Sequence, residues 1–293
     1  GSNWPHVPWP VSTEGFAPDK ITLPAKTVDV PVSREARARF YAAMARMDKE
    51  LGETMEVVDQ KLGKNTFVLF SADHGTQWPF GKWNLYDTGT RVPMVVRWQG
   101  KIAPGSKTRG MVSWVDILPT LVEVGGGEAP LELDGRSFAA AFRDPKAFGG
   151  HSEIYTTHSS DLKMNAYPMR SVRTGKWKYI ANLAPDYVFT THVDLAPAKG
   201  DGGYFPAWRR AAQTDANAKR IVDQYYRRPA EELYDLENDP EEERNLAADP
   251  AHRAIKEELK LKLNGWRMAQ HDDIPLKAPL HREEGPIDGL RRD

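Results

Sequence analysis

A carboxylate and an imidazole stand side by side at Asp73 and His74, in a Ser-Ala-Asp-His-Gly segment. Residues 66–72 form a mostly apolar run, typical of a strand buried on both faces, as in a parallel sheet covered by helices. Because ligands and metals bind at the carboxyl ends of strands in α/β sheets, Asp73 and His74 could hold a divalent cation there. The structural alternative is that Asp73 caps the next turn and His74 makes a core hydrogen bond.

A lysine follows shortly after, in the segment Phe80-Gly81-Lys82-Trp83. Flanked by aromatic residues near a strand end, Lys82 could present its positive charge to an anionic ligand. The alternative is an ordinary surface lysine. His6, which lies between two prolines near the N-terminus, leaves the same two interpretations open.

Alternating helix and strand patterns place these residues on an α/β scaffold. Apolar residues at spacings of three and four predict a helix from Ser33, its expected N-cap, to about Gly63. The strand over 66–72 follows, then a second strand over 92–98 and a short helix over 115–124. This order of elements indicates an α/β fold.

Beyond Pro145 the pattern changes. Residues 170–180 alternate like a half-exposed strand with a Gly-Lys turn inside it, and residues 232–236 form another short strand. A last helix is expected over about 250–270. We therefore divide the chain into residues 1–145, part of an α/β domain, and residues 146–293, a smaller α+β subdomain with a terminal helix.

The composition argues against several classes of protein. Lys and Arg number 40 against 41 Asp and Glu, without the basic excess expected of a nucleic-acid-binding domain. No apolar run approaches the length of a membrane span. The sequence contains no cysteine, which excludes disulfides, thiolate metal sites and a cysteine nucleophile within these residues.

Taken together, the segments resemble the sulfatases of the alkaline phosphatase superfamily in order and spacing. Those in the first half are Asn3–His6, Ser71–Gly75, Gly81–Lys82, Thr88–Pro93, Trp114–Thr120 and Leu133–Ser137. Those in the second half most resemble the N-sulfoglucosamine sulfohydrolase (heparan sulfamidase) branch: Tyr167–Val172, Tyr225–Arg227, Glu232–Asp235 and Asn245–Ala247. The resemblance spans nearly the whole chain. It implies part of a sulfatase-like, alkaline-phosphatase-like sheet sandwiched by helices, plus the smaller C-terminal subdomain.

The resemblance also implies roles for individual residues. Asp73 and His74 match the later half of the family's calcium site, although the imidazole would also suit zinc, which related phosphodiesterases bind through an Asp–His pair. Lys82 matches a basic residue that contacts the sulfate. His6 matches a histidine that binds the sulfate or assists the leaving group. Sulfuryl transfer builds charge on oxygen atoms, so a cation and fixed positive donors suit it.

A polar loop leading into the second subdomain contains His158, Asp161 and Arg170. Loops on a rigid scaffold often carry specificity, and this one falls where sulfamidases contact the sugar. We therefore expect these three residues to bind substrate. The implied substrate is a sulfated carbohydrate such as N-sulfoglucosamine, with an N–S or an O–S bond hydrolysed.

The family's nucleophile has no match in this sequence. It is a formylglycine made from Cys or Ser within a Cys/Ser-x-Pro-x-Arg segment, which this chain lacks. The paired acidic residues that complete the metal site and a Lys-x-His pair also belong upstream. We therefore expect the C-terminal part of a sulfatase, inactive alone because losing a nucleophile costs on the order of 10⁶ in turnover. An N-terminal sulfatase segment, in the same chain or in another, would complete it.

Two other functions stay open. One is a phosphodiester or phosphonate hydrolase on the same fold, which an upstream Thr nucleophile would favour. The other is a non-catalytic sulfatase relic that binds an anionic glycan. The family often works in the periplasm, outside the cell or in lysosomes, and a homo-oligomer is compatible with the sequence.

Overall fold

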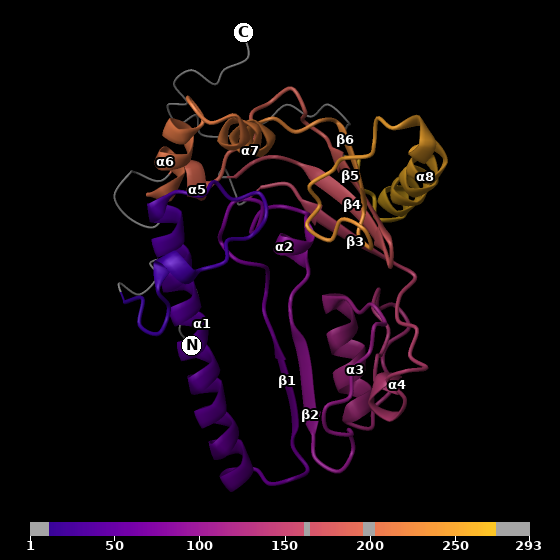
Figure 1. The fold of residues 1–293 in the computed structure, drawn as a ribbon. Helices are drawn as coiled ribbons and strands as arrows, with labels where there is room; N and C mark the ends of the chain where they lie inside the picture. Colours follow the sequence, from indigo (N-terminus) through magenta and orange to yellow (C-terminus); the bar gives the residue numbers. More distant parts are fainter. Residues whose placement is uncertain (1–11, 161–164, 196–202, 274–293) are drawn as a thin grey trace.

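The computed structural model describes residues 12–160, 165–195 and 203–273 (Figure 1). In the first half, the helix α1 (Pro31–Lys61) is followed by two strands, β1 (Phe67–Ser71) and β2 (Met94–Trp98). The helix runs along one side of this strand pair, and α3 (Ile117–Val124) lies on the other side (Figure 1). The predicted elements of this half are therefore present, each within a few residues of its expected bounds.

The pairing of these strands differs from the expected parallel arrangement. β1 and β2 run antiparallel, with Phe67 opposite Trp98 and Ser71 opposite Met94. Each residue of β1 is only half-buried, because within the described part of the chain β2 is its one strand neighbour. The apolar run correctly predicted a strand, but its expected burial on both faces is not observed among the described residues, and the direction of pairing cannot be derived from hydrophobicity.

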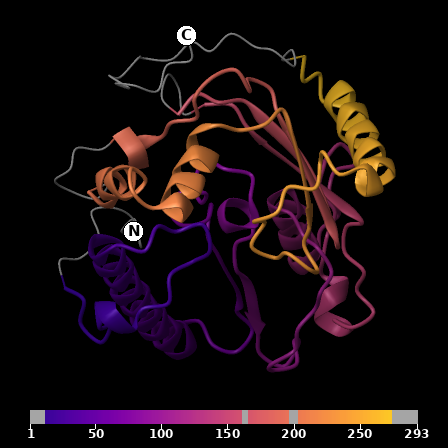
Figure 2. The same cartoon turned by 45° about the horizontal axis from the view of Figure 1, so that its top comes forward.

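The second half is built on a four-stranded antiparallel sheet in which neighbours in sequence are neighbours in space. Its strands are β3 (Glu153–His158), β4 (Met169–Thr174), β5 (Trp177–Asn182) and β6 (Glu231–Asp235). The predicted strand over 170–180 and its Gly-Lys turn are confirmed as the hairpin of β4 and β5. The expected half-exposure is wrong, because residues 169–172 and 178–182 are buried. The predicted last helix is confirmed as α8 (Arg253–Ala269), which covers one face of the sheet (Figure 2).

Short elements fill the connections. They are the helices α2 (Asp87–Thr90), α4 (Ala140–Arg143), α5 (His192–Leu195), α6 (Tyr204–Ala211) and α7 (Ala216–Tyr226), and the 3-10 turns η1 (Pro18–Lys20), η2 (Trp114–Asp116) and η3 (Pro250–His252). No helix among the described residues has a stretch long and apolar enough to cross a membrane.

Two hydrophobic clusters hold the molecule together. The larger is rich in aromatic residues and joins α1 and residues 78–86 to α6 and α7; Trp78, Trp208 and Tyr225 are among its buried members. The smaller lies between the four-stranded sheet and α8. The larger cluster contains residues from both halves of the sequence, so the two halves share a core. The proposed domain boundary at residue 145 therefore separates two patterns of strands and helices, and it stays a prediction.

Ser33 is not the N-cap that the sequence predicted. The helix begins two residues earlier, at Pro31, because proline already has a helical φ and lacks the N–H that the first turn cannot satisfy. Ser33 lies fully buried inside the helix, where its Oγ accepts a hydrogen bond of 2.7 Å from Nε1 of Trp208. Its role is to tie α1 to α6.

Several apolar side chains around the two-stranded sheet are exposed. Beyond Ala43 no residue of α1 is buried, although the apolar stripe continues along the helix. Residues more than 40% exposed on this part of the molecule are Val57, Leu62, Val95, Trp114, Val115, Leu118 and Leu121. Exposed apolar side chains on both sides of the strand pair offer surfaces suited to further apolar contact.

The buried carboxyl of Asp194 gives the fold a testable dependence on pH. Burial raises the pKa of Asp194 to about 6, although the Thr191 N–H and the Tyr225 hydroxyl donate to its Oδ1 at 2.6 and 2.8 Å. Because the folded state holds this proton more tightly than the unfolded state, the contribution to stability is full below the ordinary carboxyl pKa. It is lost as pH rises through 6, and amounts to about 3 kcal/mol.

Asp194→Asn keeps the oxygen acceptor and cannot ionise. We therefore expect the wild-type protein to lose about 2.4 kcal/mol relative to this variant between pH 4 and pH 7, measured as the difference in the free energy of urea unfolding. A difference that stays constant over this pH range would contradict the assignment.

Candidate active site

A cavity of about 1320 Å³ opens between the loop that follows β1, the segment before η2 and the four-stranded sheet. Four of the residues singled out in the sequence line it: Asp73, His74, Lys82 and His158. The first three follow β1 and the fourth ends β3, so the chain brings together residues that are 76 or more positions apart. The cavity is large enough for a sugar unit or more.

Asp73 and His74 lie at its wall with their polar atoms close together. Nε2 of His74 is 3.2 Å from Oδ2 of Asp73, and Nδ1 of His74 contacts the Gly75 carbonyl at 2.8 Å. With Nδ1 donating to that carbonyl, Nε2 keeps its lone pair for a cation. The Asp73 side chain is 79% exposed, so its oxygens are accessible from the cavity. The described residues include no group of three or more His, Asp or Glu side chains able to hold a metal.

Lys82 is presented by a tightly wound loop. Its N–H donates to the Thr76 carbonyl at 2.8 Å, and the Gly75 N–H donates to the Gly89 carbonyl at 2.9 Å, which closes the loop at its base. Nζ of Lys82 lies 4.8 Å from the centre of the Trp83 ring. Lys82 forms no ion pair with any residue that the structure describes, so its charge is available to a ligand.

The structure describes only one of the predicted residues His158, His6 and Asp161. His158 lines the cavity and its Nε2 contacts the Asn165 carbonyl at 2.9 Å. His6 and Asp161 lie outside the described residues.

The structure does not bring Arg170 to the cavity. Alternate residues of a strand point to opposite faces, so Arg170 shares with Val172 the face that α8 covers. There its Nε binds Oδ2 of Asp272 at 2.6 Å, and the side chain is buried. Ser171 and Arg173 are on the cavity face instead.

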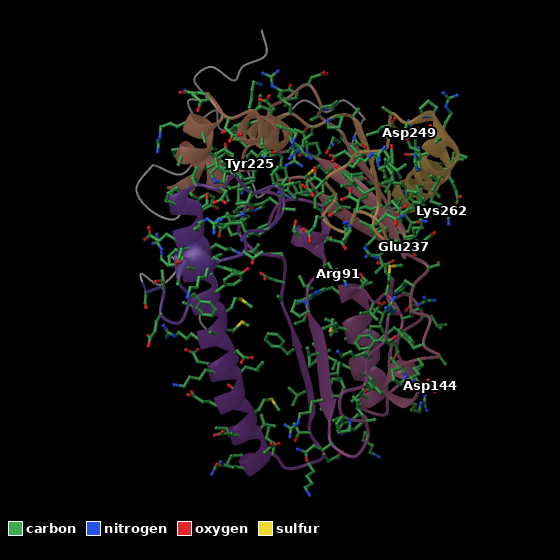
Figure 3. All side chains as sticks on the ribbon, in the orientation of Figure 1. Arg91, Asp144, Tyr225, Glu237, Asp249 and Lys262 are labelled. Atoms are coloured by element: carbon green, nitrogen blue, oxygen red, sulfur yellow. The ribbon has the colours of Figure 1, made fainter. Side chains whose placement is uncertain are left out.

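The lining of the cavity carries excess positive charge, although the whole chain has a net charge of −1. Its charged members are the cations Lys82, Arg91, Arg109, Arg173 and Lys178, and the carboxylates of Asp73 and Asp87. Figure 3 labels Arg91, which lies between the two-stranded and the four-stranded sheets. A cavity with five cations and two anions is suited to an anionic ligand.

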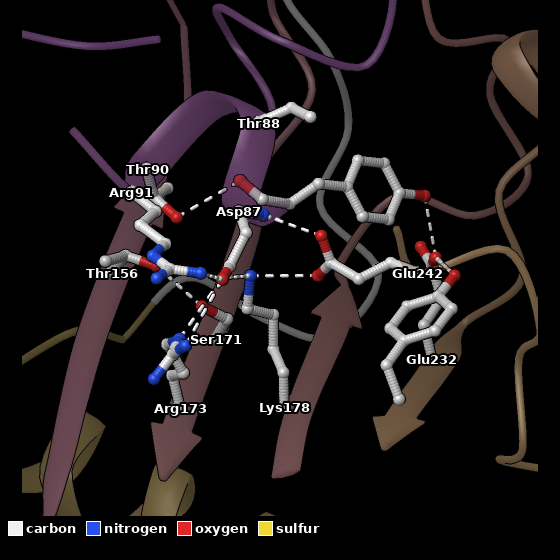
Figure 4. A network of polar contacts seen from close by, with 12 residues as sticks. Asp87, Thr88, Thr90, Arg91, Thr156, Ser171, Arg173, Lys178, Glu232 and Glu242 are labelled. Carbon is white, nitrogen blue, oxygen red and sulfur yellow. Dashed lines mark hydrogen bonds and ion pairs between the residues drawn. The ribbon is translucent and has the colours of Figure 1, made fainter. Parts of the chain in front are cut away.

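Two of these cations are held in a buried ionic network (Figure 4). Arg173 and Lys178 are directly opposite each other on β4 and β5, an unfavourable pairing of like charges. The carboxylate of Asp87 resolves it by binding Arg173 at 3.2 Å and Lys178 at 2.5 Å. Glu242 binds Nζ of Lys178 at 2.8 Å and accepts the backbone N–H of Asp87.

Burial and charge act against each other in this network. Burial raises the pKa of Asp87, but Lys178 and Arg173 outweigh it, so that pKa lies below its ordinary value. Burial also raises the pKa of Glu242 and lowers that of Lys26, to about 8. Lys26 donates to the Glu242 carbonyl and lies 4.0 Å from the centre of the Tyr86 ring. The network thus holds α2, the four-stranded sheet and the segment around Lys26 together.

Sequence reasoning missed most of these cations. Arg173 and Lys178 lie on the two strands of a segment whose alternation was recognised, and their charge on the face opposite Val172 and Tyr179 was the available signal. Arg91 lies within Thr88–Pro93, a segment noted for its family resemblance and not for its charge. Asp87, which organises the cations, shows no sequence signal of its own.

Comparison with known proteins identifies families that the chain matches. Two family models match it: "Sulfatase" over residues 2–127 and "N-sulphoglucosamine sulphohydrolase, C-terminal" over residues 73–194. An ulvan-active sulfatase of Formosa agariphila is 33% identical over 84% of this chain and 47% of the relative. Human N-sulphoglucosamine sulphohydrolase is 29% identical over 92% of this chain and 58% of the relative. The chain thus spans about half the length of the curated relatives it matches.

Solved structures share the fold. BT4656 in complex with its substrate D-glucosamine-2-N,6-O-disulfate has a TM-score of 0.62 and 17% identity over 87% of this chain and 45% of that one. The phosphonate monoester hydrolase of Agrobacterium radiobacter has a TM-score of 0.57 and 22% identity over 82% of this chain and 43% of that one.

The predicted fold class is therefore confirmed: the architecture is α/β, of the alkaline phosphatase-like type. Within that class, the chain belongs to the sulfatase family and matches the C-terminal part of its members. The family generally uses a divalent metal and a formylglycine nucleophile.

Proposed function

We propose that this chain forms part of a sulfatase that hydrolyses a sulfate ester or an N-sulfate bond of a sulfated sugar such as N-sulfoglucosamine. The observation that carries the proposal is the cationic cavity, which Lys82 and the Asp73–His74 pair line together. A sulfate group brings negative charge to the cavity, and more charge develops on its oxygens during sulfuryl transfer. Family membership and the sulfated-sugar names of the relatives and the neighbour support the same substrate class.

In this proposal Lys82 binds a sulfate oxygen and offsets the developing charge. His158, at the end of β3, lines the same cavity, where it would contact the sugar. His6 and Asp161 keep the roles that the resemblance implies, as a sulfate-binding or leaving-group histidine and a sugar-binding residue. Arg170 is not part of the proposed site, because Asp272 and α8 enclose it.

The donor pair at Asp73 and His74 fits a divalent metal. A carboxylate oxygen and an imidazole nitrogen 3.2 Å apart can approach the same ion, and the exposed carboxylate suits Ca²⁺. When bound, the ion would polarise the sulfate and stabilise negative charge on the nucleophile. Ca²⁺ takes 6–8 ligands, so further donors must come from outside this pair.

Asp73→Asn tests the metal role. The amide keeps one oxygen but removes the charge. In the protein that includes the remaining metal ligands, we therefore expect the affinity for Ca²⁺, measured by calorimetry, to fall at least tenfold, the effect typical of a lost ligand or its support. Asp59→Asn, a change at an exposed carboxylate bound to Arg97, is the matched control. Equal Ca²⁺ affinity in wild type and Asp73→Asn would exclude Asp73 as a ligand.

The nucleophile and the other metal ligands would come from a further sulfatase segment, in the same chain or in another. The exposed apolar side chains on α1, β2, η2 and α3 offer that segment a surface to pack on. Peptide mapping of the protein purified from its source tests this. A Cys/Ser-x-Pro-x-Arg peptide bearing formylglycine, in this chain or one that co-purifies, is the expected result.

A phosphonate hydrolase is the alternative, because two structural neighbours of the same fold are phosphonate monoester hydrolases. The two functions separate in a direct comparison of kcat/KM for N-sulfoglucosamine, a sulfate ester of glucosamine and a phosphonate monoester, with the protein from its source. We expect the sulfated sugars to be the better substrates. Preference for the phosphonate would overturn the proposal, and binding of sulfated glycan without turnover would indicate a non-catalytic relic.

A further inference from the structure

The backbone that presents Lys82 has an unfavourable conformation. Phe80 and Trp83, the residues on either side of the Gly81–Lys82 pair, have left-handed φ values of 66° and 64°. At Gly81 itself, a Cβ would lie 2.2 Å from the Thr76 carbonyl oxygen. Left-handed backbone is costly for residues with a Cβ, so contacts from outside must hold this loop in place.

Arg228 supplies such contacts from the second half of the chain. It follows α7 and is 2% exposed. Its Nη2 donates to Oδ1 of Asn84 at 2.9 Å and its Nη1 to the hydroxyl of Tyr86 at 2.5 Å. The guanidinium also lies 5.2 Å from the centre of the Phe80 ring. One buried side chain therefore contacts the loop at three points within seven residues.

Asn84 passes the contact on to Lys82. While its Oδ1 accepts from Arg228, its Nδ2 donates to the carbonyl of Lys82 at 3.2 Å, and its N–H donates to the Gly81 carbonyl at 3.0 Å. Asn84 is itself buried. A chain of two hydrogen bonds thus runs from Arg228 to the peptide that carries the Lys82 side chain.

The charge of Arg228 is more than packing requires. The hydroxyl of Tyr86, which accepts from Arg228, donates to Glu232 at 2.7 Å, so the guanidinium reaches its counter-charge only through a tyrosine. Well-packed apolar side chains can replace buried ions without loss of stability. What they cannot supply is a fixed fork of donors aimed at Asn84 and Tyr86 at once.

We propose that Arg228 is a positioning residue, which acts through Asn84 to fix the loop that presents Lys82 to the anionic group of the substrate. This rests on the proposed function, because it takes Lys82 as the sulfate-binding cation. It assigns to the C-terminal subdomain a part in the active site that does not require contact with the substrate.

The test measures binding of inorganic sulfate to the full 293-residue chain by calorimetry, with Lys82→Met, Asn84→Ala, Arg228→Lys and the Asn84→Ala/Arg228→Lys double variant. Arg228→Lys keeps the charge and loses the fork. If Arg228 acts through Asn84, Asn84→Ala and Arg228→Lys each weaken sulfate binding about fivefold. The double variant weakens it no further, because the two changes break the same chain of hydrogen bonds. Independent effects would instead multiply, to roughly 25-fold.

Hydrogen exchange at the amide of Lys82, which donates to Thr76, gives the second readout. In Asn84→Ala and in Arg228→Lys the Lys82 amide is expected to exchange faster than in the wild type, while the amides of β4 and β5 keep their protection. Asn245→Ala is the matched control, since Asn245 binds the backbone of β6 at Glu231 and Leu233 and has no hydrogen bond to residues 76–86 in the part of the chain that the structure describes. A merely structural role for Arg228 would move sulfate binding no more than this control does.

The outcomes separate the two claims. If Lys82→Met weakens sulfate binding but neither Asn84→Ala nor Arg228→Lys does, the positioning role is overturned and the role of Lys82 stands. If Lys82→Met binds sulfate as tightly as wild type, the sulfate-binding role fails and the positioning proposal falls with it.

Discussion

Replacing Lys178 with methionine is expected to destabilise the protein by about 3–5 kcal/mol, the cost of breaking a buried ion pair on one side. Nζ of Lys178 lies between the carboxylates of Asp87 and Glu242, and its side chain is 1% exposed. Methionine fills a similar volume, so the effect reports the two carboxylates left without this partner and not a cavity. The measurement is the free energy of urea unfolding at neutral pH.

Lys176→Met is the matched control for this prediction. Lys176 stands two residues away on the same hairpin and binds Asp235 and Glu237 at 3.7 and 3.4 Å, but its side chain is 41% exposed. Exposed ion pairs contribute about 0–1 kcal/mol, so its loss should be small. A Lys178→Met effect as small as that of Lys176→Met would show that the network does not stabilise the fold.

A second replacement separates charge from packing. Glu242→Gln in the Lys178→Met background removes one of the stranded carboxylates and keeps an acceptor for the Asp87 N–H. Because an unpaired buried charge costs more than a missing pair, the double variant is expected to be more stable than Lys178→Met alone. A double variant that is less stable than Lys178→Met would mean that Glu242 stabilises the fold by contacts other than this ion pair.

The contrast between Lys178 and Lys176 also shows how far sequence reasoning reaches. Alternation and a Gly-Lys turn were enough to predict the β4–β5 hairpin, because the side-chain period of a strand is local. The same period could have shown that Arg170 and Arg173 face opposite ways. Which face meets the cavity depends on α8, some 80 residues further along the chain, and the sequence pattern alone does not determine that.

The candidate site also combines residues that local sequence patterns could predict with residues that they could not. Asp73, His74 and Lys82 lie within ten residues of one another after a predicted strand, and family resemblance singled them out. Arg228 and Glu242, which hold the neighbouring segments, lie more than 140 positions away from them. Contacts between such distant positions follow from the packing of the aromatic core, and single residue types at these positions carry no pattern to detect.

The largest effect on activity is expected at Lys82. In the protein assembled with its nucleophile-bearing segment, Lys82→Ala should lower kcat/KM for a sulfated sugar by about 10²–10³, since removing one oxyanion donor costs roughly 2.7–4 kcal/mol. The loss should fall mainly on kcat, because charge on the sulfate oxygens is greatest in the transition state.

Lys101→Ala provides the comparison. Like Lys82, Lys101 lies over a nearby tryptophan ring, with its Nζ 6.0 Å from the centre of Trp98, but it does not line the cavity. Since the two lysines share this contact, a loss confined to Lys82→Ala isolates the effect of the charge in the cavity. A loss below tenfold at Lys82, or an equal loss at both positions, would make Lys82 a bystander and transfer the sulfate-binding role to another of the cavity's cations. Arg109 would then be the first to test, because it forms no ion pair with any residue that the structure describes, whereas Arg91 lies 3.9 Å from the Asp87 carboxylate that also binds Arg173 and Lys178.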